Sequence, residues 1–138
     1  MVLDTITIPT QLPCLAQGIA FVVACATAAG LPLTRVREVE LATEELLVNI
    51  CHYAYPGETG TIEIHYTQDD THQLLLEFSD TGQPFNPLDL PEVDLPDDIE
   101  QRPVGGLGIL LIRTLMDRVT YNRTGEKNIV QFMIRLPH

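Results

Sequence analysis

Basic side chains are scarce in this sequence of 138 residues. Its 8 lysines and arginines stand against 19 aspartates and glutamates, which gives a formal net charge of -11 at pH 7. Such a charge repels polyphosphate backbones and anionic lipid surfaces. We therefore expect neither nucleic acid nor a membrane among the partners. A phosphate ligand would need a divalent cation and backbone donors to offset the repulsion.

Cysteines and long hydrophobic runs are also scarce. The cysteines, Cys14, Cys25 and Cys51, are odd in number and lie in apolar helical surroundings, which favours buried thiols in a reducing cytoplasm over a disulfide or a metal site. The longest apolar stretch, residues 19–29, has about half the length that a bilayer span requires. No basic segment precedes it, as one would in a signal peptide. We expect a cytoplasmic protein.

The remaining composition, 45% hydrophobic and 20% charged, is typical of one globular domain, which we place at residues 1–138. Alternation and helical periodicity predict, in chain order, a strand ending at Pro9, helices over about 13–29 and 34–55, a hairpin of 61–67 and 74–80, a helix over 107–116, and a hairpin of 118–123 and 129–136. Thr34 is the expected N-cap of the second helix. This order predicts an α/β (α+β) two-layer sandwich, with a mostly antiparallel mixed sheet and helices on one face.

The segment before the third helix is rich in proline and in acidic residues. Residues 81–102 show no regular period, and a loop of about twenty residues inside a compact domain is unusual. Such loops more often act as functional lids than as plain surface excursions. We expect a lid at about residues 86–104.

Glycines stand directly before the third helix, at Gly105, Gly106 and Gly108. A helix N-terminus presents unpaired amide groups and a partial positive charge, and glycine lets a phosphate approach the backbone closely. The pattern is therefore compatible with a phosphate site. Glycines also serve as hinges, and that alternative stays open.

The second helix carries Glu45 and Asn49 four residues apart, so both side chains project from one face. The amide oxygen of Asn49 could join a magnesium shell, and Glu45 could accept a proton from an attacking hydroxyl or water. The alternative is a solvated helix face with an i,i+4 hydrogen bond.

Asp80 and Gly82 follow the end of a predicted strand. A carboxylate there can accept a hydrogen bond from an exocyclic amine while a flat ring lies against the glycine backbone. Read alone, the same residues describe an ordinary turn, because Asp and Gly are common in turns.

Taken together, the three motifs resemble a known family. They are "ELATEELLVNICHYAYPG", "DTGQPFNPLDLP" and "RPVGGLGILLIRTLMDRVTY". In this order they resemble the ATP-binding superfamily of DNA gyrase, heat-shock chaperones, histidine kinases and mismatch-repair ATPases, which has the Bergerat fold. The similarity is greatest to the stand-alone anti-sigma factor serine kinases of bacteria and covers roughly residues 5–136.

The resemblance implies a role for each motif. Glu45 becomes the catalytic base and Asn49 the magnesium ligand, while Asp80 accepts the adenine amine with Gly82 beside the ring. The phosphate-binding segment comprises Gly105, Gly106, Leu107 and Gly108. The proline-rich loop becomes the lid over ATP.

The sequence departs from the family at three places. A basic residue or histidine often follows the asparagine, where this chain has His52 and Tyr53. The candidate for a lid arginine is Arg102. A threonine near the last strand, which often contacts adenine, has no clear counterpart around residues 125–129.

The implied function is that of an ATP- and Mg²⁺-dependent serine/threonine kinase. It would phosphorylate a small STAS-type anti-anti-sigma protein and, when free, sequester a sigma factor. A homodimer is possible, although no residue stripe identifies the contact. Two alternatives remain: a nucleotide-gated binding module that transfers nothing, and a structural domain with an inactive site.

Overall fold

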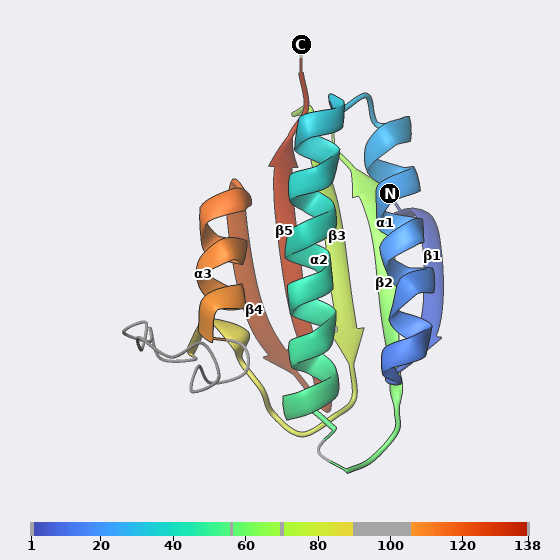
Figure 1. Ribbon diagram of the computed structural model, residues 1–138, viewed down its shortest axis with the longest axis vertical. Helices are drawn as coiled ribbons and strands as arrows, with labels where there is room; N and C mark the ends of the chain where they lie inside the picture. The colour runs from blue at the N-terminus through green and yellow to red at the C-terminus, as the bar shows by residue number, and fades with distance from the viewer. Residues whose placement is uncertain (1, 56, 70, 90–105, 138) are drawn as a thin grey trace.

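The computed structural model describes residues 2–55, 57–69, 71–89 and 106–137, which form five strands and three α-helices. Figure 1 shows the helices in front of the sheet. The elements are β1 (Val2–Pro9), α1 (Leu15–Ala28), α2 (Leu33–Tyr53), β2 (Thr61–Gln68), β3 (Gln73–Asp80), α3 (Gly106–Leu115), β4 (Arg118–Thr124) and β5 (Lys127–Arg135), with short 3-10 turns at Leu12–Cys14 and Pro87–Asp89.

The strands form one sheet in the order β1-β2-β3-β5-β4. All four pairings are antiparallel, so among the described residues the sheet is antiparallel throughout rather than mixed. The two predicted hairpins, β2–β3 and β4–β5, are confirmed. Pairing of β3 with β5 joins them into one sheet, and it aligns Asp80 with Asn128. The predicted fold class is confirmed.

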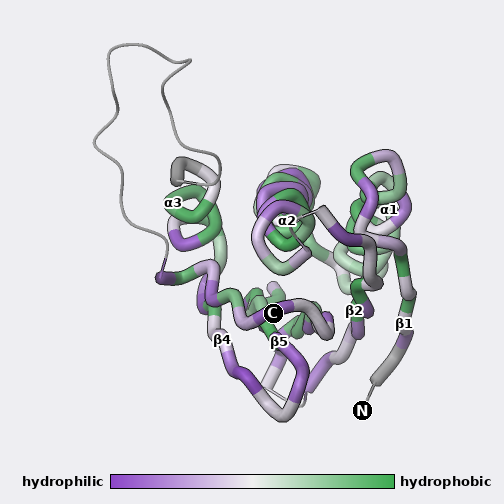
Figure 2. The backbone as a smooth tube through the Cα atoms, turned by 90° about the horizontal axis from the view of Figure 1, so that it is seen from below, coloured by the Kyte–Doolittle hydropathy of each residue, from purple (hydrophilic) through white to green (hydrophobic). Residues whose placement is uncertain are grey.

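The core lies between one face of the sheet and the helices. Figure 2 shows the three helices in a row on this face. Alternate residues of β3 and β5 point toward them, and Phe78 packs edge to face on Phe132 with ring centroids 5.0 Å apart. The apolar stripe of α2 covers these rings with Val39, Leu46 and Ile50, all at most 1% exposed. No described helix combines the length and the apolar character that crossing a membrane demands.

The start of α2 differs from the prediction. The helix begins at Leu33, its N-cap is Pro32, and no side chain caps it, so Thr34 is not the cap. Proline fixes φ near the value that extended backbone needs here, with φ -66 and ψ 156 at Pro32. Its carbonyl accepts the N–H groups of Arg35 and Val36, which opens the helix without a hydroxyl.

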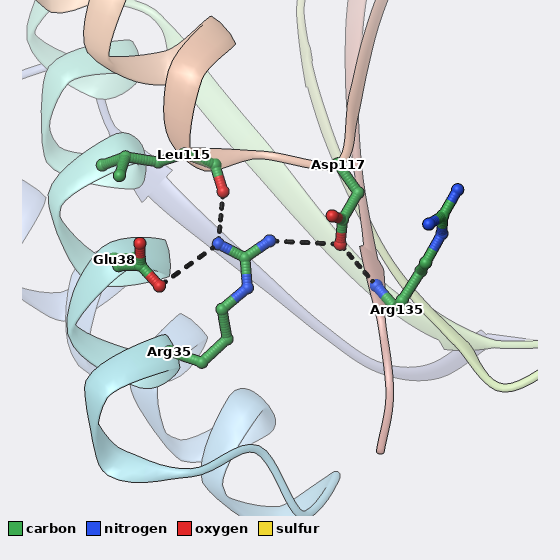
Figure 3. Close-up of polar contacts among 5 residues, drawn as sticks. All are labelled: Arg35, Glu38, Leu115, Asp117 and Arg135. Atoms are coloured by element: carbon green, nitrogen blue, oxygen red, sulfur yellow. Dashed lines mark hydrogen bonds and ion pairs between the residues drawn. The ribbon is translucent and has the colours of Figure 1, made fainter. Parts of the chain in front are cut away.

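A polar cluster attaches the end of α3 to its neighbours (Figure 3). The Arg35 guanidinium of α2 donates to the carbonyl of Leu115 and forms ion pairs with Asp117, at 3.1 Å, and Glu38, at 3.5 Å. Asp117 also accepts the backbone N–H of Arg135 in β5, at 2.8 Å. A cation at a helix C-terminus complements the helix dipole. The cluster therefore fixes the carboxyl end of α3.

The cysteines are free thiols, as the sequence predicts. Cys25 is buried between α1 and the sheet, whereas Cys14 and Cys51 are half-buried. Burial, with a smaller effect of the Asp4 carboxylate, raises the pKa of Cys25 to about 11. This thiol is therefore protonated and unreactive at neutral pH.

Candidate functional site

The three sequence motifs converge along α2. In Figure 1 the carboxyl ends of α2 and β3 lie at the same end of the molecule as the amino end of α3. Helix α2 contacts α3 near Glu45, and it contacts the segment after β3 at Ala54. These contacts are nine residues apart, or about 14 Å along a helix. Helix α2 therefore contacts the glycine motif in its second half and the Asp-x-Gly motif at its carboxyl end.

Glu45 lies against the first turn of α3. A Cβ atom placed on Gly108 would overlap the Oε2 atom of Glu45, so the absence of a side chain on Gly108 lets the carboxylate approach. Glu45 is half-buried, and its pKa is raised by burial and, to a smaller extent, by the neighbouring Glu44. A carboxylate with a raised pKa is a better proton acceptor, which is the property that a general base requires.

Asn49 lies one turn further along α2 and is completely buried. Its Nδ2 atom donates to the carbonyl of Glu45 at 2.8 Å, whereas its Oδ1 atom has no hydrogen-bond partner among the described residues. Leaving a buried acceptor unpaired costs about 1–3 kcal/mol. Asn49 is therefore not on a solvated helix face, although the i,i+4 hydrogen bond that this alternative includes is present, from Nδ2 to the carbonyl of Glu45.

The unpaired oxygen of Asn49 suits a hard cation. Magnesium prefers oxygen ligands and usually keeps several waters, binding through one or two protein groups together with substrate phosphates. Among the described residues there is no group of three or more His, Cys, Asp or Glu side chains that could hold a metal ion by themselves. Asn49 therefore fits a cation that arrives with a phosphate ligand.

Asp80 ends β3 on the helix-facing side of the sheet and is 5% exposed. Its Oδ1 atom accepts the backbone N–H of Gly82 at 2.9 Å and the Nδ2–H of Asn128 at 3.0 Å. Burial raises the pKa of Asp80, and these two hydrogen bonds and the charge of Arg123 oppose the rise. The carboxylate is thus held in position by two hydrogen bonds, both to its Oδ1 atom.

Gly82 allows the chain after β3 to lie directly on the end of α2. A Cβ atom at this position would overlap the carbonyl oxygen of Ala54, and the next residue, Gln83, donates its N–H to the same carbonyl at 3.0 Å. Phe85 then stacks on Tyr53, with ring centroids 5.1 Å apart. The glycine is therefore required by a close backbone approach beside Asp80.

The glycine motif is only partly covered by the described residues. Gly106 and Leu107 are the first two residues of α3 and Gly108 is the third, so the helix starts one residue before the predicted start. Gly105, Arg102 and residues 90–104 of the predicted lid lie outside the described residues. The described beginning of the predicted lid contains the 3-10 turn Pro87–Asp89, where Arg113 of α3 donates to the carbonyl of Leu88.

The profile of one protein family, the histidine kinase-like ATPase domain, matches residues 8–134. The chain belongs to this family. The predicted family is therefore confirmed, and the match covers all five strands and all three helices in whole or in part.

Curated relatives of this ATPase domain carry the name serine-protein kinase RsbW. The protein from Listeria innocua is 28% identical over 122 residues, covering 83% of this chain and 76% of that protein. The protein from Bacillus cereus strain AH187 is 26% identical over 119 residues, covering 81% of this chain and 74% of that protein. These names agree with the predicted kinase class.

Solved structures share the fold. The RsbU and RsbW domains of a protein from Mycobacterium tuberculosis align with a TM-score of 0.68 at 12% identity, covering 96% of this chain and 32% of that chain. The histidine kinase domain of a blue-light activated kinase from Erythrobacter litoralis aligns with a TM-score of 0.57 at 18% identity, over 88% of this chain and 61% of that chain. The ATPase domain thus spans about a third of the first of these chains.

One polar residue of this ATPase domain was missed by the sequence motifs. Asn128 is the second residue of β5, lies on the helix-facing side, is 2% exposed, and faces Asp80 across the strand pair. It lies where the sequence shows no counterpart of the family's threonine. The available signal was its position in the β5 alternation, which continues through Val130, Phe132 and Ile134 on the core face. A polar side chain in such a position must find partners.

Proposed function

We propose that this domain binds ATP with Mg²⁺ along α2 and transfers the terminal phosphate to a serine or threonine hydroxyl of a partner protein. The observation that carries the proposal is the order of groups on α2. Glu45 faces the glycine-bearing end of α3, and Ala54 supports the segment after Asp80. One turn after Glu45, Asn49 presents a buried oxygen that has no partner in the part of the chain that the structure describes. The phosphates, the cation and the proton of the attacking hydroxyl thus each have a chemically suitable group on α2 or α3.

We place the adenine ring of the nucleotide at Asp80. An ionised carboxylate has acceptor sites only, so it pairs with the exocyclic amine of adenine. Gly82 packs its backbone against the carbonyl of Ala54, where no Cβ atom can fit, and the flat ring would lie along the segment that this contact holds beside Asp80. The stack of Tyr53 on Phe85 holds the next residues of this wall in place.

The phosphate end is proposed at the first turn of α3. Its free N–H groups and the positive end of its dipole would face the phosphates, and the net charge of -11 makes such local donors necessary. Asn49 would hold the cation through Oδ1, and the bound Mg²⁺ would neutralise phosphate charge. Glu45 would accept the proton of the attacking hydroxyl, so that positioning and charge neutralisation supply the catalysis.

The partners proposed are a STAS-type anti-anti-sigma protein as substrate and a sigma factor as the protein sequestered in its absence. The relatives named serine-protein kinase RsbW and the resemblance of the three motifs support this choice. A homodimer is part of the same proposal.

The test is a transfer assay with labelled ATP and a purified anti-anti-sigma substrate. Glu45→Gln should reduce phosphotransfer by about a hundredfold or more, because proton transfer by a placed base contributes roughly that factor. Nucleotide affinity should change little. Glu44→Gln is the matched control, since Glu44 is the exposed neighbour on the same helix. It removes only the smaller of the two causes that raise the pKa of Glu45, so it should transfer at close to the parental rate. Equal rates for both variants and the parent would remove Glu45 as the base.

A second candidate function is a nucleotide-gated binding module without phosphotransfer. The position of Glu45 favours it, because a side chain packed on the first turn of α3 can link that turn to α2 without any catalytic role. If the parent binds ATP in calorimetry but transfers phosphate to no tested substrate, this second function is favoured.

A further inference from the structure

We propose that Asn128 is a positioning residue that holds Asp80 as a pure hydrogen-bond acceptor and thereby selects a 6-aminopurine nucleotide over a 6-oxopurine nucleotide. The inference rests on the proposed nucleotide site and assigns a role to a residue outside the three motifs. It is carried by the hydrogen bonds of a single buried amide.

Two backbone groups fix the orientation of this amide. The Nδ2 atom donates to the carbonyl of Gln83 at 2.9 Å, and the Oδ1 atom accepts the N–H of Phe85 at 3.1 Å. A carbonyl can only accept and a backbone N–H can only donate. A flipped amide would place like groups face to face at both contacts. Nδ2 therefore has to point toward Asp80.

The fixed orientation determines what Asp80 can do. Nδ2–H and the N–H of Gly82 both point at the Oδ1 atom of Asp80, at 3.0 and 2.9 Å. Donors aimed at a carboxylate favour its ionised form, which opposes the effect of burial. An ionised carboxylate accepts the N–H of a 6-amino group and repels a 6-carbonyl oxygen. Asn128 thus sets the hydrogen-bond polarity of the site.

The same amide also supports the wall beside Asp80. By bonding to both Gln83 and Phe85, it holds the segment that follows Gly82, while the Tyr121 hydroxyl donates to its Oδ1 atom at 2.6 Å. Tyr121 contacts the opposite end of the amide from Asp80. Removing this hydroxyl therefore perturbs Asn128 without taking a donor away from Asp80, which makes Tyr121→Phe the matched control.

The experiment measures the affinities of ADP and inosine diphosphate, which differ at position 6 of the purine, by calorimetry with Mg²⁺ over a series of pH values that spans the titration of the Asp80 carboxyl group. Asn128→Ala removes a hydrogen-bond donor from Asp80, so the pKa of the Asp80 carboxyl group should be higher in the variant than in the parent. Selectivity for ADP is present above this pKa and lost as the pH falls through it. We expect the selectivity midpoint to move to a higher pH in Asn128→Ala. At the midpoint pH of the parent, the selectivity of the variant should fall by about tenfold, the value of one hydrogen bond to a charged group.

Tyr121→Phe should keep the parental selectivity and midpoint. An equal loss of affinity for both nucleotides in Asn128→Ala, with the midpoint unchanged, would mean that Asn128 has only a structural role and would overturn the inference. If Asn128→Ala lacks a cooperative melting transition, Asn128→Ser is tested against the same criterion. A parent that binds neither nucleotide refutes the proposed function, whereas a selective parent with an equally selective Asn128 variant refutes this inference alone.

Discussion

The contact between Gly108 and Glu45 gives a prediction that does not depend on activity. In Gly108→Ala the new Cβ would overlap the Oε2 atom of Glu45 and lie 3.2 Å from both its Cβ and its Cδ. The φ angle of Gly108 is not positive, so alanine meets no backbone strain there. The measurable cost of the substitution is therefore the loss in free energy of unfolding that the overlap with Glu45 causes.

Two effects of opposite sign are expected in this variant. Alanine stabilises a helix interior by up to about 1 kcal/mol relative to glycine. Overpacking costs about 1–3 kcal/mol, and here the cost is at the low end because the nearest atom is the end of a flexible side chain. The two effects should nearly cancel, so that the free energy of unfolding of Gly108→Ala should lie within about 1 kcal/mol of the parental value.

A double-mutant cycle separates the two effects. In Glu45→Ala the carboxylate is gone, so adding Gly108→Ala should then stabilise the protein by up to about 1 kcal/mol, and the coupling energy should be about 1 kcal/mol. Urea unfolding of the four proteins measures it, and Leu110→Ala, at a half-exposed position of α3, reports general damage to the helix. If Gly108→Ala changes the free energy of unfolding by the same amount in the parent and in Glu45→Ala, the contact is refuted.

Two further predictions concern stability. Arg35→Ala should lower the free energy of unfolding by about 1.5–3 kcal/mol, because it removes a charged donor from the carbonyl of Leu115 and leaves Asp117 with only the N–H of Arg135. Arg37→Ala, which breaks an exposed pair with Glu40, should cost under about 1 kcal/mol. Similar losses for the two variants in urea unfolding would contradict the role of the cluster. Because burial and Glu44 raise the pKa of Glu45 in the folded state, its ionised form destabilises the fold above that pKa. Glu45→Gln should therefore raise the melting temperature at pH 7, and the gain should disappear as the pH falls through the folded pKa toward the ordinary glutamate value; a gain that grows toward acid pH would show the opposite shift.

Much of the fold could be predicted from the sequence because its signals are local. Alternation along β2, β3 and β5 and the apolar stripe of α2 depend on neighbours a few residues away, and Gly30 and Pro56 bracket the second helix. The error at its N-terminus is also local. Thr34 has the right chemistry for a cap, but Pro32 already supplies the extended conformation and the accepting carbonyl. Two competing start signals lay within three residues of each other.

The candidate site was only partly predictable. Glu45, Asn49, Asp80 and Gly82 carry recognisable chemistry at recognisable spacings, so the sequence pointed to them. Asn128 was missed because its role comes from the pairing of β3 with β5, and the two residues are separated by 48 positions in the chain. No spacing rule links strands from different hairpins.

The sequence by itself determined most of the elements, the candidate residues of the site, and the family to which the chain belongs, since periodicity and motifs are properties of short segments. The tertiary structure alone decided that Asn49 is buried with no partner for its oxygen among the described residues, that Gly108 leaves room for the Glu45 carboxylate, and that Asn128 donates to Asp80. Each of these depends on packing between segments far apart in the chain. Burial and hydrogen-bond satisfaction are set by three-dimensional neighbours, which local sequence does not encode.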